Sequence, residues 1–149
     1  MYRIVFGVYV IMIFLFLAGC VSVAGEEVPF VIIDEGDSYS GFAEQQGVVV
    51  YSTEEWEKLW KQVHASIVPT PELPEVDFDQ QIIVAVFAGE KPSGGYTVKV
   101  DRILQTDEAV TVYVVEDSPE PEEMTITVIS YPYQMVKMPY TDLPVDFEF

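Results

Sequence analysis

The pattern of hydrophobic and polar residues beyond residue 27 is that of β-strands. A period of two places one strand face on a core and the other in solvent, whereas a continuous apolar run predicts a strand covered on both faces. Residues 82–88 form such a run and predict a central strand. Residues 96–101 alternate and then change phase at Arg102, which predicts a β-bulge. The other predicted strands are 28–33, 47–51, 110–116, 124–130 and 134–138.

One segment has the period of an amphipathic helix. Ser52 followed by Glu55 is a capping box, which predicts a helix start. The apolar residues after it share one helix face: Trp56, Leu59, Trp60, Val63 and Ile67. A pair of tryptophans could stack on a ligand, but we interpret these two as the large side chains by which the helix covers a sheet. The proline-rich stretch 69–74 ends the helix.

These elements predict a mainly β (α+β) fold, an antiparallel β-sheet or sandwich of about six to eight strands with one packed amphipathic helix. The length of 149 residues suits one domain. The acidic stretch 34–37 is interpreted as a turn, and it lacks the residue spacing of an EF-hand calcium loop. The acidic stretch 117–123 is interpreted as a solvent-facing loop.

The N-terminus has the organisation of a bacterial lipoprotein signal peptide. Arg3 precedes a long uncharged apolar stretch, and Leu17-Ala18-Gly19-Cys20 resembles the lipobox, in which the cysteine receives the lipid. We therefore predict a signal peptide at 1–19, a lipidated Cys20 with a tether to residue 27, and a domain at 28–149. This places the domain outside the cytoplasm, held by lipid at the cell membrane or envelope. An uncleaved anchor spanning the bilayer with residues 4–24 is the alternative.

The composition excludes several function classes. Seven Lys and Arg residues against 25 Asp and Glu residues give a formal net charge of −18, which excludes a nucleic-acid partner because phosphate binding depends on basic side chains. One Cys and one His exclude an internal disulfide, a Cys-rich zinc site and a His-based metal cluster. We expect no metal and no cofactor.

Few residues are candidates for catalysis. Cys20 is used for lipidation and lies outside the domain, so it is not a thiol nucleophile. His64 lies near the helix end, where a positive charge suits the helix dipole, and the chain has no Gly-x-Ser-x-Gly motif to supply a serine. The many carboxylates leave a glycosidase-like pair open, but no spacing singles one out. We predict that the protein is not an enzyme.

Two rigid loops are the candidate interaction surface. The first follows the central strand, where Pro92 fixes its own φ and Gly94 and Gly95 permit positive φ. The second contains two tyrosines, which add contact area at low entropic cost. The candidate residues are Lys91, Pro92, Ser93, Gly94, Gly95, Tyr96, Tyr131, Pro132 and Tyr133. The alternative is that the first loop is a wide hairpin connection whose glycines serve geometry alone.

These loops carry a family resemblance. The order Phe87-x-Gly89-x-Lys91-Pro92-Ser93-Gly94-Gly95-Tyr96, followed by Tyr131-Pro132-Tyr133-x-x-Val136, resembles the PrcB C-terminal domain family. The helical stretch 52–60 also occurs in such proteins, so the resemblance extends over residues 47–138. It implies a non-catalytic lipoprotein subunit that binds and stabilises a bacterial surface protease. The expected partner is thus a protein, with a protease as the candidate, and no catalytic residue is implied.

A second similarity leads to the alternative functions. The two proline-containing loops occur in the same order as the wedge loops of chagasin-type cysteine-protease inhibitors, but the leading Asn and the Trp of those loops are absent here. A chagasin-like inhibitor is therefore one alternative to a non-catalytic interaction domain. A small-ligand-binding envelope lipoprotein is a separate alternative.

Overall fold

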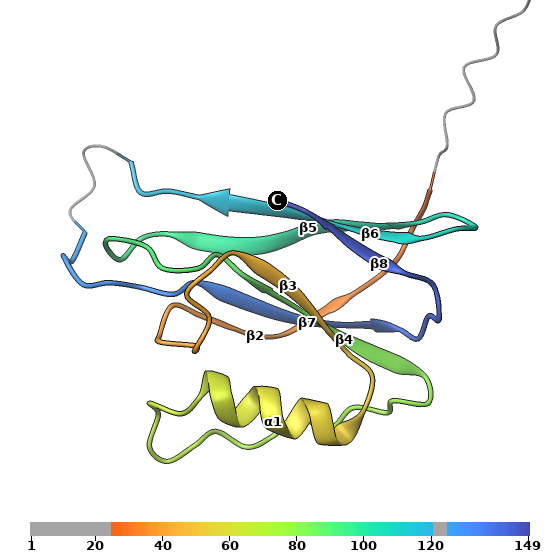
Figure 1. Cartoon of the computed structure of the whole chain (residues 1–149), viewed down its shortest axis with the longest axis horizontal. Coiled ribbons are helices and arrows are strands. Elements are labelled where there is room, and N and C mark those ends of the chain that lie inside the picture. Colours follow the sequence, from red (N-terminus) through yellow and green to blue (C-terminus); the bar gives the residue numbers. More distant parts are fainter. Residues whose placement is uncertain (1–24, 121–124) are drawn as a thin grey trace, which may run out of the picture.

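Two four-stranded sheets pack face to face, and one helix lies against the outer face of the second sheet (Figure 1). The computed structural model describes residues 25–120 and 125–149. The first sheet has the order β1 (Glu26–Glu27), β5 (Thr97–Gln105), β6 (Val110–Asp117), β8 (Val145–Glu148). The second has the order β2 (Val31–Gly36), β7 (Tyr133–Pro139), β4 (Gln81–Phe87), β3 (Gln46–Val50), and the helix is α1 (Thr53–Val63). The predicted mainly β sandwich with one packed helix is confirmed.

The pairing is antiparallel except at one edge. β6 and β8 run parallel, from Val110 opposite Val145 to Tyr113 opposite Glu148. The predicted antiparallel pairing does not extend to this edge, because β8 follows a connection that leaves the second sheet and crosses to the first, so no hairpin sets its direction. β8 itself was not predicted. Its Phe147 ring packs directly on Gly47 of β3, which leaves no room for a side chain at that glycine.

β4 is covered on both faces, as its continuous apolar sequence predicts. Ile82, Val84 and Val86 face the first sheet, and Ile83, Ala85 and Phe87 face α1. All six side chains are completely buried. Because β4 lies between two hydrophobic layers, it holds the start of the loop that follows Phe87 in a fixed position.

The helix begins and packs as the sequence predicts. The Ser52 hydroxyl accepts a hydrogen bond from the Glu55 N–H, and the Glu55 carboxylate reaches back to the N–H of Tyr51. Trp56, Leu59, Trp60 and Val63 are buried against the second sheet, whereas Ile67 lies beyond the helix end. The indole N–H groups of Trp56 and Trp60 donate to the carbonyls of Pro74 and Pro71. The tryptophans therefore hold both the helix and the proline-rich stretch that follows it.

Three sequence-based strand boundaries differ from the structure. The predicted strand 28–33 is divided, since Val28 joins the first sheet through its hydrogen bond to Ile103 and β2 begins only at Val31. Asp34, Glu35 and Gly36 were predicted as a turn and are instead paired with β7. Glu26 and Glu27 pair with β5. The two acidic segments were not predicted as strands because their polarity hides the fact that an available strand edge pairs polar residues as well as apolar ones.

The predicted β-bulge and the predicted strand at 124–130 had opposite outcomes. The register between β5 and β6 shifts between Val100 and Arg102, so the bulge is confirmed. Residues 125–130 form no strand, and only Ser130 makes a β-bridge, with Lys91. Ile126, Val128 and Ile129 are largely exposed, because the segment lies beyond the end of both sheets and finds no strand to pair with.

The segments that carry the N-terminal predictions are outside the described residues. These are the signal peptide, Cys20 and the tether as far as residue 24. Among the residues that the structure describes, no helix combines the length and hydrophobicity needed to cross a membrane.

Candidate functional site

The two loops singled out from the sequence lie side by side at one end of the sandwich, on the left in Figure 1. The Lys91 N–H donates to the Ser130 carbonyl (N···O 2.8 Å), and the Ser130 N–H donates to the Lys91 carbonyl (3.0 Å). The Ser130 hydroxyl also donates to the Ser93 carbonyl (2.6 Å). The Ala88 N–H donates to the Pro132 carbonyl (2.9 Å). The loops are therefore one hydrogen-bonded unit, and we call this end of the molecule the loop end.

Tyr131 joins this unit to a third loop. Its N–H donates to the carbonyl of Asp37 (2.8 Å), and its hydroxyl donates to a carboxylate oxygen of Glu90 (2.8 Å). The hydrogen bond to Glu90 raises the pKa of Tyr131 above its ordinary value. Its ring meets that of Tyr39 edge to face, with centroids 5.0 Å apart. Tyr131 thus fixes the relative positions of the three loops.

Lys91 forms an ion pair within the protein. Its ammonium lies 2.7 Å from a carboxylate oxygen of Glu116 and 5.9 Å from the centre of the Tyr96 ring. Because its charge is paired with that of Glu116, Lys91 adds little net positive charge to the surface that a partner would meet. The loop end instead exposes the carboxylates of Asp37 and Glu90. It is an acidic surface despite the lysine in its motif.

Glycines shape the first loop, but at different positions from those expected. Gly95 has φ +88°, as the sequence suggested, whereas Gly94 does not have positive φ. The second position with positive φ is Gly89, at +77°. A side-chain carbon at Gly89 would lie 2.9 Å from the carbonyl oxygen of Ala43 and 2.9 Å from the N–H of Gln45, so backbone crowds it. Gly89 therefore lets the loop leave β4 closely packed against the segment that leads to β3.

The predicted contact residues divide into exposed and buried ones. Pro92 and Gly95 are exposed, and Lys91, Ser93, Tyr96 and Tyr131 are half-buried. Gly94, Pro132 and Tyr133 are buried. Tyr133 is only 5% exposed and belongs to β7, so its side chain is a core residue rather than a surface contact. Its place in the motif reflects packing.

The structure adds exposed apolar residues that the sequence interpretation missed. Tyr39 is 56% exposed and Ile126 is 70% exposed; Val128 and Ile129 are 60% and 54% exposed. They surround a hollow of about 350 Å³ whose floor includes Gly94 and Tyr131. The sequence did contain a signal, since residues 124–130 are strongly apolar, but that signal was interpreted as a strand.

Tyr133 points into a buried polar cluster beneath the loop end. Its hydroxyl donates to a carboxylate oxygen of Asp34 (3.0 Å), and the same oxygen lies 2.9 Å from Nε2 of His64. Nδ1 of His64 is 2.9 Å from the carbonyl of Trp60. His64, which is 2% exposed, therefore joins the helix end to β2 and β7. It lines none of the four main hollows in the described part of the chain. The cluster is a structural network.

The buried Tyr133 leads to a prediction for high pH. Burial, followed by the nearby charge of Asp34, raises the pKa of Tyr133 well above its ordinary value of 10.0. Above about pH 10 the unfolded chain loses this proton while the folded protein keeps it, so the free energy of unfolding falls as pH rises. Tyr133→Phe should make this fall shallower in urea titrations between about pH 10 and 12.

Asp34→Asn serves as the control for this prediction, because it removes the neighbouring charge and keeps the burial of Tyr133. The slope of its free energy of unfolding against pH should lie between the slopes of the wild type and Tyr133→Phe. If Tyr133→Phe and the wild type had the same slope, Tyr133 would not hold its proton in the way described.

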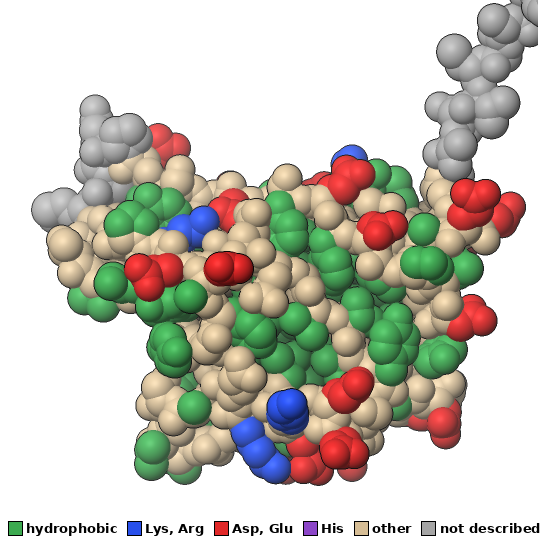
Figure 2. All heavy atoms as spheres, viewed as in Figure 1, with side chains coloured by type: hydrophobic (Ala, Val, Ile, Leu, Met, Phe, Trp, Pro, Cys, Tyr) green, Lys and Arg blue, Asp and Glu red, His purple; other side chains and the backbone are tan. Residues whose placement is uncertain are grey.

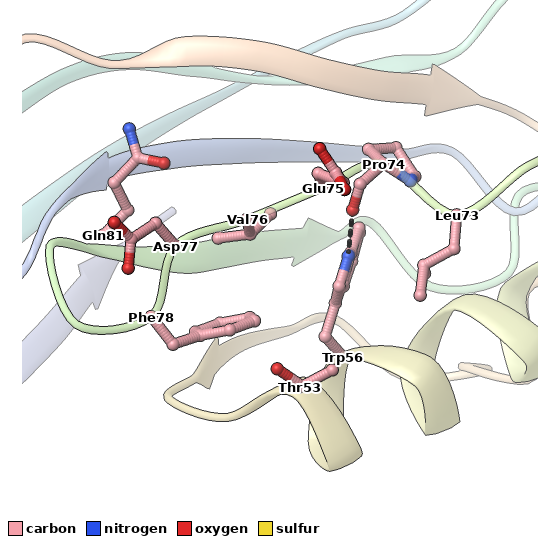
Figure 3. A pocket seen from close by; sticks show the side chains of 9 residues that line it. All are labelled: Thr53, Trp56, Leu73, Pro74, Glu75, Val76, Asp77, Phe78 and Gln81. Atoms are coloured by element: carbon pink, nitrogen blue, oxygen red, sulfur yellow. Dashed lines mark hydrogen bonds between the residues drawn. The ribbon is translucent and has the colours of Figure 1, made fainter.

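A larger hollow, of about 480 Å³, lies between the start of α1 and the stretch 73–78 (Figure 3). Two of the polar side chains around it are engaged within the protein: the Trp56 indole donates to Pro74, and Asp77 accepts from the N–H of Asp79 and the side chain of Gln80. A small-molecule site needs polar groups that converge on a ligand. Trp56 and Asp77 are therefore held by the protein itself and are not free to orient a small ligand in this hollow.

Metal-ligating residues do not cluster in the described part of the chain. No group of three or more His, Cys, Asp or Glu side chains there is arranged to hold a metal ion. The carboxylates of the loop end are left as charges on a surface.

Comparison with known proteins identifies the segment that carries this site. Residues 82–139 match the family model described as PrcB C-terminal. The match runs from β4 through both loops to the end of β7 and leaves residues 47–81 of the earlier resemblance outside it. Neither the curated proteins nor the solved structures gave a match.

Proposed function

Because residues 82–139 match the PrcB C-terminal family model, we propose that this chain is a non-catalytic, lipid-anchored protein that binds another protein through its loop end. The resemblance to this family implies a domain associated with a protease complex. A surface protease that the domain binds or stabilises is accordingly the partner that we propose.

The observation that carries the proposal is the geometry of the loop end. Three loops from distant parts of the sequence are hydrogen-bonded into one surface, with Tyr131 at their junction. The surface exposes Tyr39, Ile126 and Ile129, although the domain already has two well-filled cores to bury such residues. Exposed apolar side chains on a rigid support, with acidic groups at the rim, are typical of a protein interface.

The non-catalytic role is supported by where the chemically able side chains are. His64 is enclosed by Trp60, Asp34 and Tyr133, and among the described residues no serine or cysteine is a hydrogen-bond partner of its ring. Asp34 is occupied by the same network. General acid–base catalysis requires such a group within reach of a substrate, which a buried histidine does not meet.

The anchor follows from the lipobox at residues 17–20. Lipidation of Cys20 would place the domain on a membrane facing outside the cytoplasm, within reach of a surface protease. Only a few residues separate Cys20 from β1, so the domain would stand close to the membrane that holds it.

Site-specific photo-cross-linking in intact cells tests the proposal. A photoreactive phenylalanine analogue replaces Tyr39 at the loop end in the full chain. We expect one discrete adduct, whose second component mass spectrometry identifies as a protease or a subunit of its complex. A parallel culture labelled with a fatty acid should show label on the wild type and none on Cys20→Ser.

Tyr140 is the matched control position. It is a tyrosine of similar exposure, 50% against 56% for Tyr39, and lies at the other end of β7. The analogue at Tyr140 should give little adduct. Equal adducts at both positions, or none at Tyr39, would contradict binding through the loop end, and label on Cys20→Ser would contradict the anchor.

A further inference from the structure

The loop end contains two adjacent hollows that share one carboxylate. The first is the apolar hollow of about 350 Å³ described above, with Ile126, Ile129 and Tyr131 in its wall. The second is a groove of about 310 Å³ between β2 and β5, lined by Glu35, Tyr96 and Tyr133 among others. Asp37 lines both.

The two glycines of the motif separate these hollows. Gly94 lines the first and Gly95 lines the second. A side-chain carbon at Gly94 would lie 3.1 Å from Ile126, and one at Gly95 would lie 3.0 Å from Pro119 and from Thr125. Neither glycine adds a side chain to the boundary between the hollows, and the shared Asp37 places the two hollows within reach of one segment of a partner.

The hollows differ in chemistry. The apolar hollow is surrounded by Ile126, Val128 and Ile129, all more than half exposed. The groove is lined by Glu35 and Asp37 from the β2 side and by Lys99 from β5, whose ammonium is 3.8 Å from Asp117 on β6. Figure 2 shows hydrophobic side chains next to acidic ones at this end of the molecule, on the left. The first hollow suits an apolar side chain, and the second suits a positive charge.

The charge of the whole chain agrees with this assignment. A formal net charge of −18 repels a second copy of the chain and an anionic lipid surface, and it attracts a basic partner. The lysine in the motif does not change the sign, because Glu116 neutralises it. The occupant that charge favours is therefore a basic protein segment.

We infer that the loop end binds a segment of its protein partner in which an Arg or Lys adjoins a large apolar residue. The apolar side chain enters the hollow beside Ile129, and the cation lies in the groove against Asp37 and Glu35. This inference rests on the proposed function and adds the chemistry of the partner to it.

The test uses the full chain, captured in nonionic detergent on a surface plasmon resonance sensor, and three synthetic peptides. The probe is Gly-Ser-Arg-Leu-Ser-Gly with both ends blocked. One matched peptide has Glu in place of Arg, and the other has Ser in place of Leu. We expect the probe to bind about tenfold more tightly than either matched peptide, and we expect its affinity to fall as the salt concentration is raised.

Variants of the protein locate the binding. Asp37→Asn should lower the affinity for the probe peptide about threefold, and Ile129→Ser should lower it about tenfold. The matched controls are Asp142→Asn and Val31→Ser, an exposed carboxylate and an exposed valine away from both hollows, and they should bind the probe as the wild type does.

Equal affinity for the three peptides, no binding at a few millimolar, or equal effects of Asp37→Asn and Asp142→Asn would overturn the inference. A photo-adduct of twice the chain mass at Tyr39 would also overturn it, since the occupant would then be a second copy.

If the Tyr39 adduct with another protein forms while the peptides show no selectivity, the proposed function stands and only the partner chemistry is wrong. Selective peptide binding without any Tyr39 adduct in cells supports the chemistry and counts against the proposed function.

Discussion

Replacing Trp56 with alanine is expected to lower the free energy of unfolding by about 3–5 kcal/mol. The side chain is 1% exposed and fills the space between α1 and the second sheet. Its indole N–H holds the Pro74 carbonyl at 3.0 Å, so the substitution also leaves that carbonyl without its partner. Urea unfolding followed by circular dichroism measures the change. Against a total stability of about 5–15 kcal/mol, the loss is large.

A second variant at this position separates packing from hydrogen bonding, and a variant at an exposed tyrosine is the control. Trp56→Phe keeps most of the buried surface and loses the N–H, so its loss should be clearly smaller than that of Trp56→Ala. Tyr140→Ala removes an aromatic side chain that is 50% exposed, and it should cost about 1 kcal/mol or less. If Trp56→Ala were as mild as Tyr140→Ala, the helix would not be held to the sheet by this side chain.

Gly89→Ala is expected to destabilise the protein by about 2–4 kcal/mol, which combines the strain of positive φ with a steric clash. The glycine has φ +77°, and the atoms that would crowd a side-chain carbon belong to the backbone of Ala43, Glu44 and Gln45. Backbone cannot move aside as a flexible side chain can, so the loop after β4 must separate from that segment. Thermal unfolding measures the stability, and the hydrogen exchange of the Glu90 N–H, which donates to Ala43, reports the local separation.

Gly94→Ala is the matched control in the same loop. Gly94 does not have positive φ, and its nearest neighbour is the side chain of Ile126, which is 70% exposed and free to shift. The expected loss is below about 1 kcal/mol. Equal losses for the two variants would mean that the loop tolerates a new conformation at Gly89.

Local sequence patterns predicted the fold well where one segment alone carries the information. The capping box at Ser52 and the apolar stripe through Trp60 require only residues within a few turns of one another. The continuous apolar run of β4 reflects burial on both faces, and the change of phase near Arg102 reflects a bulge. The loops at Lys91 and Tyr131 were recognised because proline, glycine and tyrosine have distinct conformational properties.

The candidate site was predicted less completely, because its members come from loops that are distant in the sequence. Asp37 and Tyr39 carry no local signal and reach the site only because β2 ends beside β7. The exposed segment that contains Ile129 has the composition of a strand, and nothing local shows that it lies beyond the sheets. Tyr133 has the composition of a contact residue, and its position in β7 makes it a core residue.

The sequence by itself determined the mainly β class, the single amphipathic helix, the central buried strand and the loops that carry the family motif, since each depends on periodicity or on the conformational preference of one residue. The tertiary structure decided which strand edges pair and that β8 runs parallel to β6. It also decided that Lys91 forms an ion pair with Glu116, whereas Asp37 lines both hollows of the loop end. Those features depend on contacts between segments far apart in the chain, and such contacts cannot be predicted from the local sequence pattern.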